Sequence, residues 1–214
     1  YVSSYLSLFI QMMTGMEFLY TDTAIPSSAF GIIIYYLRMV IFPAMAEEFA
    51  MRGVIMQSLR RWGDTFALAM SSLVFALMHG NMVQAPFALL AGFILGYAVI
   101  RSGSLWTSII IHMINNGVSV TLSLIAAREN EAMGNLVTVL VSGVLIVAGI
   151  LCFAILFKQR KLPRPFPNRT MLPSRICYQT FILTIPMILV LLYMIGQTLM
   201  MIKIPWLESL VGWN

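Results

Sequence analysis

Ionisable and amide side chains recur at helical spacing inside three hydrophobic stretches of this chain. They form three motifs in chain order, which are Glu47-Glu48-x-x-x-Arg52, Phe75-x-x-x-His79 and His112-x-x-x-Asn116. A charged side chain at bilayer depth costs roughly 3 kcal/mol on insertion scales, so three such clusters indicate one polar site inside a membrane protein. Both histidines of the chain lie in these motifs.

The residue types in the motifs suit hydrolysis of a peptide bond. A glutamate and a histidine that converge can hold and deprotonate a water molecule. A second histidine and an asparagine amide can donate hydrogen bonds to the oxyanion of a tetrahedral intermediate, so no acyl-enzyme is needed. Plainer roles stay open: His79 could bind a carbonyl, and His112 and Asn116 could join helices through bonds worth about 0.6–2 kcal/mol each.

The spacing within the motifs places particular side chains on one helix face. Glu48 and Arg52 are four residues apart, so we predict an ion pair between them. Glu47 points about 100° away and is left to face a cavity. His112 and Asn116 also share a face. Phe75 is expected to be a wall or packing group beside the site.

The composition makes the bilayer the natural solvent for this chain. Of its 214 residues, 60% are hydrophobic and 10% are charged, which a soluble domain of this size could not bury. The net charge is +5, but the surplus cations are confined to a few loops, so nucleic-acid binding is not indicated. Cys152 and Cys177 lie in or at the ends of apolar stretches and are interpreted as small hydrophobic residues. Because the chain begins at Tyr1 instead of Met, we expect an N-terminal truncation.

Seven apolar stretches are long enough to be transmembrane helices. They cover about 3–20, 28–59, 65–81, 85–101, 104–127, 134–157 and 176–202. Pro43 cannot donate to the Met39 carbonyl, so a kink or restart is expected in the second stretch. Strands are not expected, because the runs are long and do not alternate. The predicted fold is an all-α polytopic membrane bundle of about seven transmembrane helices.

The distribution of cations predicts the orientation and the domains. If seven helices alternate, one side holds nine cations: Arg60, Arg61, Arg101, Lys158, Arg160, Lys161, Arg164, Arg169 and Arg175. The positive-inside rule makes this side cytoplasmic. We therefore predict a transmembrane bundle over 1–157 with its catalytic core at about 40–120, a basic proline-rich cytoplasmic loop over 158–175, and a C-terminal helix and tail over 176–214. On this topology Glu47, His79 and Asn116 share a level roughly 20 Å from the cytoplasmic ends of their helices.

The three motifs resemble the family of CAAX proteases and bacteriocin-processing enzymes, which are intramembrane endopeptidases. That family carries Glu-Glu-x-x-x-Arg, Phe-x-x-x-His and His-x-x-x-Asn/Asp on successive helices. The stretches from Gly92 to Tyr97 and from Arg101 to Trp106, with Asn115-Asn116-Gly117, are also similar to the family. The likeness covers roughly residues 40–120.

The resemblance implies an intramembrane endopeptidase of the glutamic type, a group formerly classed as metalloproteases. It implies that Glu47 and His79 activate the water and that His112 and Asn116 stabilise the oxyanion. Glu48 and Arg52 would support them. No cofactor is expected; zinc stays an alternative, which requires the Glu and His side chains to lie within about 2 Å of one point.

The expected partners are the lipid bilayer and a peptide or protein substrate, either lipidated or of the bacteriocin type. The expected location is a bacterial cell membrane. A non-catalytic regulatory or bacteriocin-immunity module with the same fold is the main alternative function. A proton-coupled transporter could use the same buried groups as a relay, but the chain lacks paired interrupted helices in matched halves. Gly92-x-x-x-Gly96 is interpreted as a close-packing helix face.

Overall fold

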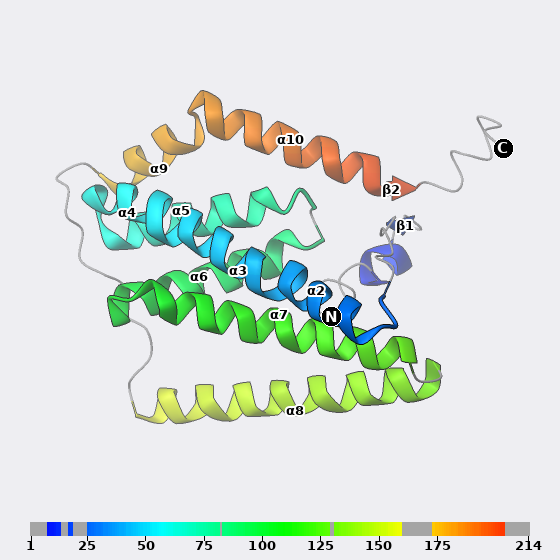
Figure 1. Cartoon of the computed structure of the whole chain (residues 1–214). Coiled ribbons are helices and arrows are strands. Elements are labelled where there is room, and N and C mark those ends of the chain that lie inside the picture. The colour runs from blue at the N-terminus through cyan, green and yellow to red at the C-terminus, as the bar shows by residue number, and fades with distance from the viewer. Residues whose placement is uncertain are drawn as a thin grey trace, which may run out of the picture. The chain divides into compact units, whose positions relative to one another are not determined.

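The computed structural model describes residues 8–13, 17–18, 25–81, 83–128, 131–159 and 173–203, and these are almost entirely helical (Figure 1). The helices are α2 (Ala29–Tyr36), α3 (Phe42–Glu48), α4 (Met56–Leu59), α5 (Asp64–Met78), α6 (Ala85–Ser102), α7 (Leu105–Arg128), α8 (Glu131–Lys158), α9 (Ser174–Ile182) and α10 (Ile185–Met201). Two π-helical segments, Leu37–Ile41 and Phe49–Ile55, join α2, α3 and α4 into one continuous helix, which ends in the 3-10 turn Arg60–Trp62. Two short strands, β1 (Glu17–Phe18) and β2 (Ile202–Lys203), pair antiparallel.

Several of these helices are long and apolar enough to cross a membrane. In the part of the chain that the structure describes there are four: Ala29–Trp62, Ala85–Ser102, Leu105–Arg128 and Ala132–Ile155. The bent pair α9–α10 would make a fifth if it is one span, and α5 is apolar but shorter. The prediction of an all-α membrane bundle is confirmed, and the count is compatible with about seven.

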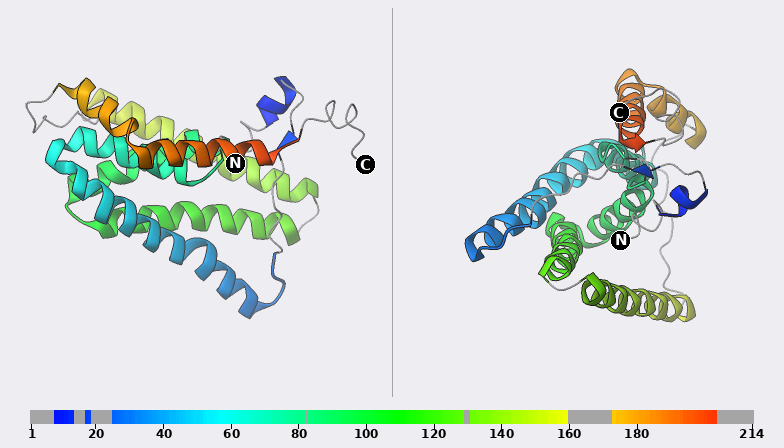
Figure 2. Two further views of the ribbon diagram at one scale, coloured as in Figure 1. Left: turned by 90° about the horizontal axis from the view of Figure 1, so that it is seen from above. Right: turned by 90° about the vertical axis from the view of Figure 1, so that its right-hand side faces the viewer.

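Two of the predicted helical stretches differ from the structure. The first, 3–20, lies largely outside the described residues; within it 8–13 are helical, and Glu17–Phe18 form a strand instead of a helix. The last, 176–202, is two helices bent by 60° (Figures 1 and 2). Pro186 explains the break, because its ring disfavours a helical residue before it and suits the first turn of a new helix.

Pro43 does not interrupt the second helix. The chain stays helical from Ala29 to Trp62, and the five π-helical residues that end at Ile41 immediately precede the proline turn. A π segment changes the hydrogen-bonding register of a helix, so it can accommodate a residue that has no N–H to donate. The expected restart was therefore wrong, and the backbone change lies one turn before the proline.

The chain divides into two compact units, which are described separately. Unit 1 comprises Tyr1–Thr23, Ala46–Ile109 and Pro167–Asn214, and unit 2 comprises Ala24–Met45 and Ile110–Phe166. In unit 1, α5 is the central helix and contacts α6, α4, α9 and α10. In unit 2, Val40 packs with Val120 and Leu124 in one buried cluster.

The packing of α5 against α6 depends on two glycines, as the Gly92-x-x-x-Gly96 spacing predicted. A Cβ added at Gly92 would lie 3.0 Å from both Cα and Cβ of Ser72, and one added at Gly96 would lie 2.6 Å from Leu68 Cδ1. The absence of side chains therefore lets the two backbones approach closely.

We expect Gly92→Ala to destabilise the protein by about 1–3 kcal/mol, because the new methyl group meets the Ser72 backbone and cannot be accommodated by a rotamer change. Gly143→Ala on α8 is the matched control, since nothing lies within 4 Å of the added Cβ there. Denaturant unfolding in detergent micelles measures both. Equal stability of the two variants would contradict the close contact.

Candidate active site

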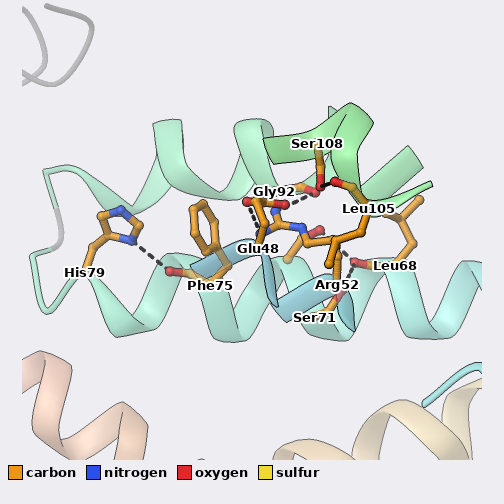
Figure 3. A network of polar contacts seen from close by, with 10 residues as sticks. Glu48, Arg52, Leu68, Ser71, Phe75, His79, Gly92, Leu105 and Ser108 are labelled. Atoms are coloured by element: carbon orange, nitrogen blue, oxygen red, sulfur yellow. Dashed lines mark hydrogen bonds and ion pairs between the residues drawn. The ribbon is translucent and has the colours of Figure 1, made fainter. Parts of the chain in front are cut away.

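The predicted ion pair between Glu48 and Arg52 is present, and it is buried. Arg52 Nη1 donates to Glu48 Oε1 at 2.8 Å, and the two side chains are 1% and 0% exposed. The guanidinium also donates through Nη2 to the Gly92 carbonyl at 3.2 Å (Figure 3). Its carbon atom Cζ lies 4.5 Å from the centre of the Phe75 ring. The pair thus joins the long helix that contains α3 and the Phe49–Ile55 segment to α5 and α6.

The contacts of Arg52 outside its own helix were not predicted. Gly92 was assigned only a packing role, but the close approach of α6 also brings its carbonyl oxygen to the guanidinium. Phe75 was expected to be a wall, and its burial at 4% exposure agrees with that role. Its ring face additionally stabilises the cation, an interaction worth about 2 kcal/mol when desolvated. The sequence signal for this contact is an intramembrane arginine, with an aromatic residue on one neighbouring helix and a glycine on another.

His79 lies at the end of α5, and one hydrogen bond orients its ring. Its Nδ1 is 2.8 Å from the Phe75 carbonyl oxygen (Figure 3). A carbonyl oxygen can only accept, so Nδ1 is the donor in this bond, which in a neutral ring leaves Nε2 as the acceptor. The imidazole stands edge-on to the Phe75 ring, with centroids 4.9 Å apart. His79 is half-buried. Its ring is held by the Phe75 carbonyl and the Phe75 ring, and Nε2 is not used in the hydrogen bond to that carbonyl.

The turn after His79 ends the helix earlier than the sequence predicted. Gly80 has φ of +63°, a left-handed conformation that glycine adopts without the steric cost of a Cβ. Asn81 Oδ1 then accepts the Val83 N–H at 2.8 Å. The predicted helix to residue 81 stops at Met78, so His79 belongs to the helix terminus and not to its interior.

Glu47 differs from its neighbour Glu48 in burial. Glu47 on α3 is half-buried, whereas Glu48 is fully buried against Arg52. The difference agrees with the 100° rotation between consecutive helical residues, which turns Glu47 to another face of the helix. The structure therefore separates the two carboxylates as expected, with Glu48 committed to the ion pair.

His112 and Asn116 lie on the part of α7 that belongs to unit 2. His112 is buried and Asn116 is half-buried, and their four-residue spacing in a continuous helix puts them on one face. Asn116 Oδ1 accepts from Asn115 Nδ2 at 3.2 Å, so the N–H groups of the Asn116 amide are not used in that bond. The convergence of these two side chains with Glu47 and His79 stays a prediction.

A metal site was the alternative to water activation by Glu and His alone. Over the described ranges, no group of three or more His, Cys, Asp or Glu side chains could hold a metal ion. Both cysteines are free thiols, exposed at Cys152 and buried at Cys177. The expectation that no cofactor is needed stays a prediction.

The three motifs fall within one family match. Residues 29–118 match the family described as type II CAAX prenyl endopeptidase Rce1-like. This segment of the chain belongs to that family. The Rce1-like segment begins with α2 and ends within α7, so α8, α9 and α10 lie outside it. No match was found among curated proteins or among solved structures.

Membership and the apolar helices together define the class of protein. The helices long enough to span a bilayer, together with the match of residues 29–118 to a family of endopeptidases, support an integral membrane protein. All seven residues of the three motifs lie in the Rce1-like segment, although the match itself does not identify which of them act in catalysis.

Proposed function

We propose that this protein is an intramembrane endopeptidase of the glutamic type, in which Glu47 and His79 activate the attacking water. The observation that carries the proposal is the Rce1-like match over residues 29–118, which contains the carboxylate, both histidines and the asparagine. The hydrogen bond from His79 Nδ1 to the Phe75 carbonyl supports it, because in a neutral ring it leaves Nε2 to accept a hydrogen bond from water.

In the proposed reaction each polar group has a separate role. Glu47 takes a proton as the water oxygen attacks the scissile carbonyl carbon, and His79 holds that water. His112 and Asn116 donate hydrogen bonds to the carbonyl oxygen as it becomes an oxyanion. The proton on Glu47 then passes to the amide nitrogen when the C–N bond breaks, which regenerates the carboxylate. Glu48 and Arg52 do not react, and their ion pair holds the helix that carries Glu47 against α5 and α6.

The substrate is proposed to be a membrane-associated peptide or protein, either lipidated at its C-terminus or of the bacteriocin type. We further propose a bacterial membrane as the location, with the basic loops in the cytoplasm. Labelling of new protein termini in membranes that contain the wild-type chain or Glu47→Gln tests the proposed substrate class. New termini that require Glu47 support the endopeptidase, and identical terminal peptides in the two membranes contradict it.

We expect Asn116→Ala to reduce turnover of such a substrate by about 10²–10³-fold, as the loss of an oxyanion donor usually does. Asn135→Ala is the matched control, because Asn135 is an exposed asparagine on α8 outside the Rce1-like segment. Steady-state cleavage by the purified proteins in lipid nanodiscs measures the effect. If Asn116→Ala and Asn135→Ala turn over equally fast, Asn116 has no part in the mechanism.

A further inference from the structure

The C-terminal helix α10 lies outside the Rce1-like segment but packs against the helix that carries His79. Leu77 of α5 forms a buried cluster with Met187 and Met194 of α10, and each is 4% exposed. These residues all belong to unit 1. The contact is therefore made at the C-terminal end of α5, one turn or less from His79.

The same helix also covers the turn that follows His79. A Cβ built on Gly80 would lie 3.5 Å from Gln197 Cγ, 3.6 Å from Gln197 Cβ and 3.7 Å from Tyr193 Cε1. A side chain at this position would be in ordinary van der Waals contact with both residues, so Gln197 and Tyr193 are the neighbours of the turn on the α10 side.

The direction of the His79 ring depends on this turn. His79 follows the last residue of α5, so its backbone lacks the full set of helical hydrogen bonds, and helix ends fray. The Nδ1 bond to the Phe75 carbonyl persists only while the last turn keeps its shape. A side chain that lies beside Gly80 leaves the turn less room to open, which limits fraying and so keeps Nε2 pointing in one direction.

We propose that α10 is part of the catalytic unit and that Gln197 and Tyr193 are positioning residues for His79. This inference rests on the proposed function, because it assigns a purpose to the orientation of the imidazole. It means that the Rce1-like segment by itself is an incomplete enzyme. The helix that completes it reaches the active histidine through the Gly80 turn and contributes no reacting group.

The kinetic test compares variants of Gln197 in the full chain. Gln197→Ala removes the Cγ atom that lies beside the turn, and it is expected to lower kcat roughly 10- to 100-fold with little change in KM, since a small misplacement of a catalytic group has effects of that size. Gln197→Met keeps Cβ and Cγ but loses the amide, and it should restore most of the turnover. Leu192→Ala, on an exposed face of α10, is the matched control and should cleave like wild type. Equal kcat in Gln197→Ala and Leu192→Ala overturns the proposal.

A second measurement does not require cleavage. The chain has only two histidines, so protein labelled with ¹⁵N-histidine gives two ring spectra, and His112→Gln assigns them. In wild type, His79 should show a protonated Nδ1 and an unprotonated Nε2. In Gln197→Ala the two tautomers should average, while Gln197→Met should match wild type.

The two measurements separate the positioning role from the proposed function. An unchanged His79 spectrum in Gln197→Ala overturns the positioning role, whatever the activity. If the spectrum changes but the wild-type chain cleaves no membrane peptide, the positioning contact is supported and the endopeptidase assignment fails.

Discussion

Glu47→Gln should lose cleavage while the protein stays folded. The amide has the size of the carboxylate but cannot take a proton from water, so the contribution of a general base, about 10²–10⁴-fold in rate, disappears. Initial rates of peptide cleavage by purified protein in nanodiscs measure the loss, and the unfolding transition of the same samples reports the fold. Because Glu47 is half-buried and Glu48 holds the ion pair, we expect little change in stability.

The control for this variant is Glu131→Gln, which removes the same charge at the start of α8, outside the Rce1-like segment. It should cleave at the wild-type rate. Full activity of Glu47→Gln would remove the glutamate from the mechanism. A Glu47→Gln chain that still restored the phenotype of a deletion strain would favour the alternative of a non-catalytic regulatory or immunity module.

Arg52→Ala should destabilise the protein by about 3–5 kcal/mol, since it leaves the Glu48 carboxylate buried without its cation. The variant also loses the hydrogen bond to the Gly92 carbonyl and the contact with the Phe75 ring. Denaturant unfolding in micelles measures the change. The same experiment on Glu48→Leu/Arg52→Met should recover much of the loss, because neither buried charge remains.

The chain contains a matched pair for comparison with Glu48–Arg52. Arg60 and Asp64 are also four residues apart and bind at 2.7 Å, but Arg60 is 30% exposed. Arg60→Ala should therefore change the free energy of unfolding by no more than about 1 kcal/mol. If Arg52→Ala and Arg60→Ala lower the free energy of unfolding equally, burial does not increase the cost of breaking the Glu48–Arg52 pair.

Interactions within one helix were predictable from the sequence. The ion pair between Glu48 and Arg52 requires only that residues 48 to 52 be helical, which the apolar run and the lack of alternation already indicated. The separation of Glu47 from Glu48 follows from the same helical rotation. The packing role of the Gly92-x-x-x-Gly96 face was also evident, because small residues at that spacing allow helices to approach.

Breaks between helices were predicted less well, although part of the signal was present. Pro186 marks the bend between α9 and α10 and could have been used to divide the stretch 176–202. The compensation at Pro43 by a preceding π segment has no comparable signature, because it depends on how a long helix distributes its hydrogen bonds. The helix end at Met78 is set by the positive φ of Gly80.

The sequence by itself determined that this is a membrane protein of helices, which polar residues occur within them, and to which family their order belongs. Those properties follow from composition and from spacing along one helix. Only the tertiary structure decided that Arg52 binds the Gly92 carbonyl and the Phe75 ring, which nitrogen of His79 faces the Phe75 carbonyl, and that α10 lies beside the turn that follows. These contacts join residues that are far apart in the chain or lie at helix ends, where periodicity gives no information and packing selects the partner.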